Sequence, residues 1–303
     1  MGWRATAGVA VIALAAGAAG AFYWVHAHGE APVRAKGEGA PIVVAPDRDA
    51  PLDREVPKSV VAATHEVGAQ PVDPVKAAAA VDPGIPLRAG EVLEFTANVA
   101  KLNNVATLTL QVAERRSFLG KSAWHLQAFA HTQNPFRMVF VLDDQFDSYS
   151  DAGNLASLQY EMRLDERGQK VESVQQMTVT GKEPAPPNAS RTRVLPGTRD
   201  PLGMMQYLRN VDWMKTPEVR GPVYDGHKLY DVRARLTGTS TAVEVPAGKF
   251  VASTIDLQVF DNGVESKDAH FTLYLANNAT RTPVLLEAVL PVATARVELV
   301  KSK

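Results

Sequence analysis

The sequence predicts an all-β domain beyond residue 86: a single antiparallel β-barrel, or a curved half-barrel or sandwich, with one short amphipathic helix. Two observations predict this class. Apolar and polar residues alternate with period two over many short stretches, as in strands that bury one face. Turn residues recur about every 8–12 residues, a spacing typical of sandwiches and barrels. We expect roughly ten to twelve strands in about 215 residues.

The earliest strands have the clearest pattern. Alternation runs over residues 93–99, and the Asn103-Asn104 pair that follows predicts a turn, because asparagine tolerates positive φ. Alternation resumes over residues 106–112 and 124–130. These stretches predict an antiparallel meander. Residues 138–142 are expected to form a short apolar strand, and residues 185–197, after three prolines, an exposed loop.

One helix is expected to interrupt the strands. Asp200 is a predicted N-cap, and Pro201 then occupies the first helical position. The apolar face of this helix carries Met204, Met205, Tyr207, Leu208 and Val211. The opposite face carries Gly203, Gln206, Arg209 and Asn210. An amphipathic helix must lie on something apolar, so these apolar residues, with Trp213, are the candidate lining or lid of a ligand pocket.

The first 85 residues differ from the rest. The run from Ala5 to Val25 carries no charge, is long enough to cross a bilayer, and follows Arg4. It predicts either a cleaved signal peptide or a retained membrane anchor. Residues 26–85 are punctuated by proline and show no lasting period, which predicts a disordered linker. The expected organisation is therefore residues 1–25, 26–85 and 86–303.

Composition excludes several classes of site and partner. The chain has no cysteine, which excludes disulfides, thiolate catalysis and lipid attachment at a cysteine. The formal net charge is −1, which argues against a nucleic-acid partner. The apolar N-terminal run predicts an extracytoplasmic location: anchored in the inner membrane and facing the periplasm, or secreted to the periplasm if the run is cleaved.

Three groups of residues have side chains that could form a chemical site. The densest acidic cluster is Asp143, Asp144, Asp147 and Asp151, but it lacks the spacing of a calcium loop. His125 and His131 fall about 20 Å apart on one strand, too far to share a metal. Asp225, His227 and Ser253 lack a nucleophile elbow. We therefore expect no catalytic residues, no metal and no cofactor.

Several short motifs occur in an order that resembles the bacterial family of domains of unknown function numbered 3108. They are residues 89–95, 147–151, 200–209, 224–230, 246–250 and 273–283. The resemblance spans about residues 86–303 and implies an exported all-β protein with no assigned activity. At Leu275-Ala276-Asn277 the sequence departs from the Ser-Asp pair that is frequent in the family. By looser analogy the family is similar to the half-barrels of periplasmic lipoprotein carriers, which enclose acyl chains.

Two functions are expected. The first is a non-enzymatic cell-envelope protein that binds a lipid or another apolar small molecule in a cavity of the β domain. The second is a structural or assembly factor that binds another envelope protein through a sheet edge. An apolar cavity would favour the first function, and a packed core with a bare sheet edge would favour the second.

Overall fold

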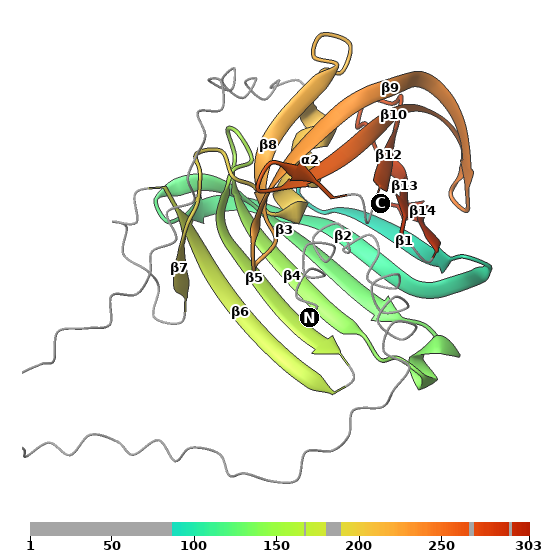
Figure 1. Ribbon diagram of the computed structural model, residues 1–303, viewed down its shortest axis with the longest axis horizontal. Coiled ribbons are helices and arrows are strands. Elements are labelled where there is room, and N and C mark those ends of the chain that lie inside the picture. The colour runs from blue at the N-terminus through green and yellow to red at the C-terminus, as the bar shows by residue number, and fades with distance from the viewer. Residues whose placement is uncertain (1–86, 167, 180–188, 267–269, 291–292) are drawn as a thin grey trace, which may run out of the picture. The chain divides into compact units, whose positions relative to one another are not determined.

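The computed structural model describes residues 87–166, 168–179, 189–266, 270–290 and 293–303. The run from Ala5 to Val25 and the predicted linker lie outside these residues. Within the described ranges, no helix is both long and apolar enough to cross a membrane. Strands make up most of the described chain, which contains one α-helix, as the alternation predicts (Figure 1).

One sheet contains all fourteen strands of the described chain. The strands are β1 (Glu91–Val99), β2 (Leu102–Phe118), β3 (Lys121–Thr132), β4 (Asp143–Asp151), β5 (Ser157–Glu166), β6 (Gln169–Thr178), β7 (Ser190–Arg193), β8 (Glu218–Tyr224), β9 (Leu229–Val245), β10 (Gly248–Asp261), β11 (Val264–Glu265), β12 (His270–Ala276), β13 (Pro283–Val289) and β14 (Thr294–Ser302). The count exceeds the expected ten to twelve because β7 and β11 have only four and two residues.

The strand order is β7-β6-β5-β4-β3-β2-β1-β14-β13-β12-β10-β9-β8, with β11 paired to β10. The first and last strands therefore lie side by side in the middle of the sheet, and hairpins extend from them to both edges (Figure 1). Neighbouring strands are antiparallel except β6 and β7, which are parallel. The two edge strands do not pair with each other, so the sheet is open in its strand order.

A short segment nevertheless bridges the two halves of the sheet. The Ser157 N–H donates to the Thr198 carbonyl at 2.9 Å, and the Arg199 N–H donates to the Pro222 carbonyl at 3.0 Å. The Tyr224 N–H returns a bond to the Arg199 carbonyl at 2.8 Å. These three bonds join β5 to β8 through Thr198 and Arg199, although the two strands lie far apart in the strand order.

The helix α2 (Pro201–Asn210) begins as predicted, with Asp200 as its N-cap and proline in its first turn. It packs against β3, β4 and β8, and its apolar side chains belong to the main core cluster. The predicted polar face is also buried, because Gln206, Arg209 and Asn210 are each at most 5% exposed. The helix therefore lies inside the domain instead of covering the surface. Most of its polar side-chain atoms are paired there, although Arg209 Nε and Asn210 Oδ1 have no hydrogen-bond partner.

Three local predictions differ from the structure. The β1–β2 turn falls at Ala100 and Lys101, three residues before the predicted asparagine pair, and Asn104 has a φ of 53° inside β2. Residues 138–142 do not form a strand, because the chain instead makes a 3-10 turn, η2 (Phe136–Met138). A short apolar run cannot be assigned to a strand by periodicity alone. The predicted loop at 185–197 contains the short strand β7.

Candidate functional site

The N-terminal end of α2 is held by a buried carboxylate. Asp200 is fully buried, and one of its oxygens accepts a bond from the Gly203 N–H at 2.8 Å. Its other oxygen accepts bonds from the hydroxyls of Ser148 and Ser157. Burial raises the pKa of Asp200 above its ordinary value, and the hydroxyl and N–H donors oppose that rise. The cap thus connects α2 to both β4 and β5.

The C-terminal end of α2 is held by a buried ion pair. The guanidinium of Arg209, 1% exposed, donates two bonds of 2.8 Å to the two carboxylate oxygens of Glu91. It also donates to Gln206 Oε1 and to the Thr280 carbonyl. A bidentate arrangement of this kind fixes orientation as well as distance. Asp200 and Arg209 therefore fix the two ends of α2. Moving either end would separate a buried ionisable group from its partners.

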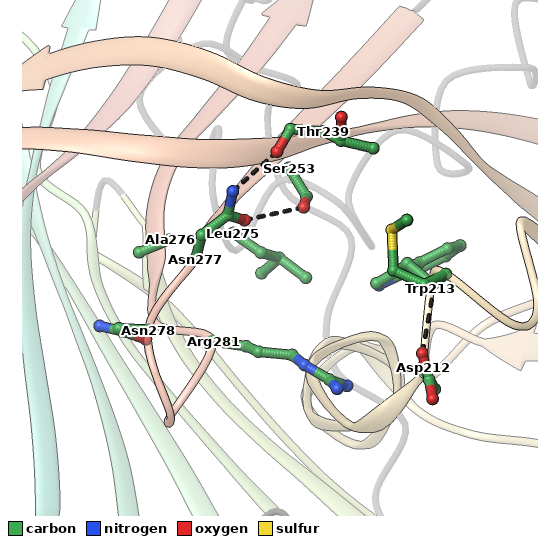
Figure 2. Close-up of a pocket in the computed structure, with 10 residues that line it drawn as sticks. Asp212, Trp213, Thr239, Ser253, Leu275, Ala276, Asn277, Asn278 and Arg281 are labelled. Atoms are coloured by element: carbon green, nitrogen blue, oxygen red, sulfur yellow. Dashed lines mark hydrogen bonds between the residues drawn. The ribbon is translucent and has the colours of Figure 1, made fainter.

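A pocket of about 320 Å³ lies beside this C-terminal end (Figure 2). Asp212, Trp213 and Met214, which follow the helix, form one side. Thr239 of β9, Ser253 of β10 and the end of β12 with its following turn form the other, through Leu275, Ala276, Asn277, Asn278 and Arg281. The pocket therefore combines an aromatic ring and three apolar side chains with amides, hydroxyls, a carboxylate and a cation.

Hydrogen bonds fix the polar wall of the pocket. The Asn277 carboxamide donates to the Thr239 carbonyl at 2.7 Å and accepts from the Ser253 hydroxyl at 2.9 Å, so one side chain joins three strands (Figure 2). On the opposite side, Trp213 Nε1 donates to the Leu208 carbonyl at 3.0 Å. These contacts give the pocket walls that are formed before any ligand arrives.

Arg281 is the cation of the pocket. Its Nη1 donates to the carbonyls of Arg209 and Val211, which are the free acceptors at the end of α2. No carboxylate in the described part of the chain forms an ion pair with Arg281. Asp212, the acidic residue of the pocket, pairs instead with Lys215 at 2.8 Å. The Arg281 side chain is thus the least neutralised charge at this site.

The six residues predicted to line or cover a ligand pocket lie close together, but five belong to the core and one lines the pocket. Met204, Tyr207, Leu208 and Val211 are buried in the core, and Met205 is half-buried against it. Trp213 is also buried, and it alone of the six lines the pocket. The rest of the lining was missed because it comes from strand ends that are distant in sequence. One signal was present, since Leu275, Ala276 and Asn277, the site of departure from the resembled family, all line the pocket.

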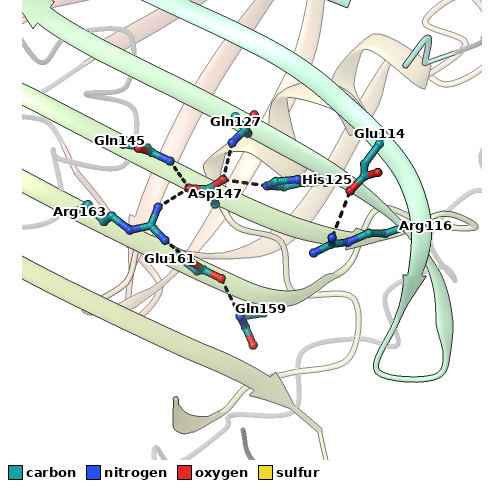
Figure 3. Close-up of polar contacts among 9 residues, drawn as sticks. All are labelled: Glu114, Arg116, His125, Gln127, Gln145, Asp147, Gln159, Glu161 and Arg163. Carbon is teal, nitrogen blue, oxygen red and sulfur yellow. Dashed lines mark hydrogen bonds and ion pairs between the residues drawn. The ribbon is translucent and has the colours of Figure 1, made fainter. Parts of the chain in front are cut away.

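A second polar cluster lies on the face of β3, β4 and β5 that points away from the core (Figure 3). Its centre is Asp147, 4% exposed, whose oxygens accept bonds from His125, Gln127, Gln145 and Arg163 at 2.7–2.9 Å. Burial alone would raise the pKa of Asp147. The hydrogen bonds from His125, Gln127 and Gln145 outweigh burial and lower that pKa to about 2.

The other groups weighed from the sequence are separated. His131 pairs with Asp143 at 2.9 Å, whereas His125 pairs with Asp147. Asp225 accepts bonds from the backbone N–H groups of His227 and Lys228, and Ser253 donates to Asn277, so no hydrogen bond links these three as a triad. Within the described ranges, no group of three His, Asp or Glu residues could hold a metal ion.

Comparison with solved structures finds low-identity matches. A β-barrel-like protein of the domain of unknown function 1849 from Brucella abortus is 12% identical, with a TM-score of 0.47, and the match covers 72% of this chain and 99% of that one. A protein from Parabacteroides distasonis whose description proposes a lipoprotein is 15% identical, with a TM-score of 0.34 and coverage of 72% and 97%. A protein with a YmcC-like fold from Bacteroides fragilis, described as a proposed exported protein, is 11% identical, with a TM-score of 0.30 and coverage of 72% and 98%.

No curated protein matches the sequence. The profile of the family described as protein of unknown function (DUF3108) matches residues 56–300. This match confirms the resemblance carried by the ordered motifs, and it begins 30 residues before the expected start at residue 86. The chain therefore belongs to the DUF3108 family.

Proposed function

We propose that the β domain binds a small amphipathic molecule in the pocket at the end of α2 and acts as a non-enzymatic binding protein of the bacterial cell envelope. The observation that carries this proposal is the make-up of the pocket. Trp213 and the exposed side chain of Met214 face a wall that contains Asn277, Ser253 and Arg281. Such a mixture suits a molecule with one apolar part and one polar or anionic part.

Size and rigidity support the proposal. A volume of about 320 Å³ is at the lower end of the range of small-molecule sites, which begins at about 300 Å³. Fixed walls reduce the ordering cost of binding, and here both the Asn277 bonds and the anchored helix fix them. Met214, with its unbranched and polarizable chain, can adapt to ligands of different shape.

The position of α2 refines the expected role of the helix. A lid must move away to admit a ligand, and moving α2 would break the buried pair between Arg209 and Glu91. Leaving one such charge without its partner costs about 3–5 kcal/mol. We therefore place the ligand beside the fixed end of the helix, and not beneath the helix.

The test is uptake of an amphipathic fluorescent anion, anilinonaphthalene sulfonate, by the full chain. Met214 is 77% exposed, so Met214→Glu should leave the fold intact while placing a negative charge in the pocket. We expect the affinity for the probe to fall about tenfold, which is about 1.4 kcal/mol. Val264→Glu is the matched control, because Val264 is 70% exposed and lies outside the pocket. Equal affinities of the two variants would contradict the proposal.

A second candidate function is assembly through a sheet edge. Strand β7 pairs only with Gln175–Thr178 of β6, so within the described ranges residues 169–174 have no partner strand on the side away from β5. A strand from another protein could add there. Lys170 and Glu172 on this edge are charges of the kind that discourage such pairing, and for that reason we rank this function second.

A further inference from the structure

We infer that the turn between β3 and β4, residues 136–140, is a contact with a phospholipid bilayer. This inference is independent of the pocket. The sequence here is Phe136-Arg137-Met138-Val139-Phe140. Met138 is 84% exposed and Val139 is 75% exposed, two of the three highest values among the large apolar side chains of the described chain. They are consecutive, so they form one apolar tip. Scattered single apolar residues need no explanation, whereas two adjacent ones on a turn form a small apolar patch that a partner can cover.

The tip is held in place from below. Phe136 and Phe140 are half-buried and pack against the main core cluster on either side of it. Arg137 donates two hydrogen bonds to the carboxylate of Asp143, and His131 contacts the same carboxylate at 2.9 Å. The hydrogen bond from Arg137 is the main reason that the pKa of Asp143 falls to about 2. The charges at the base of the tip therefore neutralise each other.

The backbone of the tip is prepared for an apolar medium. The N–H groups of residues 137 to 140 donate to the carbonyls of Gln133, Pro135 and Phe136 at 2.9–3.0 Å. An unpaired N–H in hydrocarbon costs several kcal/mol, which normally keeps loops out of membranes. Because these donors are already satisfied within the turn, Met138 and Val139 can enter the outer layer of a bilayer without that penalty.

The predicted organisation of the chain identifies a bilayer as the partner. Of the two alternatives predicted for the apolar run from Ala5 to Val25, the retained anchor attaches the protein to a membrane, and 61 residues, 26–86, separate this run from the described domain. A tether of this length raises the effective concentration of the domain at the membrane surface, whether it behaves as a coil or as a more extended proline-rich spacer. Two apolar side chains alone bind a membrane only marginally, and stable attachment takes two signals. The tip would supply the second signal.

The natural absence of cysteine allows a direct test on the full chain. Met138→Cys is labelled with an environment-sensitive dye, and the protein is reconstituted in vesicles of phosphatidylethanolamine and phosphatidylglycerol with brominated acyl chains. Leu195→Cys is the matched control, because Leu195 is 56% exposed and lies at the opposite end of the strands from the tip. Its neighbour Val194 donates its N–H to the carbonyl of Thr178, the last residue of β6. We expect about twofold quenching at position 138 and none at position 195.

A further variant separates insertion from mere proximity. Val139→Asp, made in the Met138→Cys background, places a charge on an exposed position and should not disturb folding. Quenching at position 138 should then return to the level of the control. Equal quenching at positions 138 and 195, absence of quenching at both, or quenching at 138 that persists with Val139→Asp would each overturn the inference.

Discussion

Asp144 and Asp147 lie three residues apart on β4 and are almost equally buried, at 5% and 4% exposed, yet their acidities are opposite. Asp144 points to the core side. Burial, followed by repulsion from Glu166, raises the pKa of Asp144 to about 7. Asp147 points to the other side, where its donors lower its pKa to about 2. Because these two carboxylates are almost equally exposed, the donors and charges around each of them, and not the difference in burial, set their opposite pKa shifts.

Removing the carboxylate with many donors should have the largest effect. Asp147→Ala leaves His125, Gln127 and Gln145 without their acceptor, and we expect a loss of about 3–4 kcal/mol in the free energy of unfolding at pH 7. Because the folded pKa is below the unfolded one, this contribution is present above about pH 4 and is lost as the pH falls through about 2. Urea unfolding of the native chain and of this variant, at pH 7 and at about pH 2, measures this contribution to the free energy of unfolding.

The matched control is Asp151→Ala, on the same face of β4. Asp151 accepts one exposed backbone bond from Gly153, so its loss should cost less than about 1 kcal/mol. A cost for Asp147→Ala no larger than for this control would mean that the cluster in Figure 3 is not a source of stability.

Neutralising Asp144, the carboxylate with few donors, should increase the free energy of unfolding at high pH instead of reducing it. The raised folded pKa of Asp144 means that its stability contribution is complete below the unfolded pKa, about 3.9, and is lost as the pH rises through about 7. Asp144→Asn keeps an acceptor for the Asp165 N–H and removes the charge. We expect unchanged stability at pH 4 and a gain of about 2–3 kcal/mol at pH 8.

Asp143→Asn serves as the neighbouring comparison, because the pKa of Asp143 is lowered and its pairing with Arg137 would be lost. That variant should be less stable than the native chain at pH 8. If both asparagine variants changed stability in the same direction, the contrast between the two faces of β4 would fail.

The smallest effect should come from Arg163. Its side chain is 46% exposed, and exposed ion pairs contribute only about 0.5–1 kcal/mol. Arg163→Gln should cost that amount and leave the pKa of Asp147 below its ordinary value, since His125, Gln127 and Gln145 remain. Carbon-detected NMR titration of the Asp147 carboxyl measures this pKa directly. A return of the pKa to about 3.9 would mean that the charge of Arg163, and not the neutral donors, lowers it.

Patterns within a single element were readable from the sequence. The alternation over residues 93–99 predicted β1, and the Asp200-Pro201 pair predicted where α2 begins. Contacts between distant segments were not readable. Nothing near Arg209 in sequence indicates that its partner is Glu91, 118 residues away, and without that partner Arg209 looks like a solvent-facing residue.

The pocket was hidden for the same reason. Its lining comes from four separate stretches of chain, and each of them contributes residues that look like an ordinary turn or strand end. The pKa contrast on β4 was equally hidden, because the four aspartates of the acidic cluster look alike in sequence. Only the strand pairing decides which of them meets His125 and which meets Glu166.

The pairing of the first and last strands has a mechanical consequence. Val92 and Lys303 exchange two backbone hydrogen bonds, of 3.2 and 2.9 Å, so a pull applied between residues 87 and 303 acts on adjacent points. Such a pull would break the hydrogen bonds between β1 and β14 one after another and would divide the sheet in its middle. If the force were applied between residue 87 and the edge strand β8, many interstrand hydrogen bonds would share the load at once.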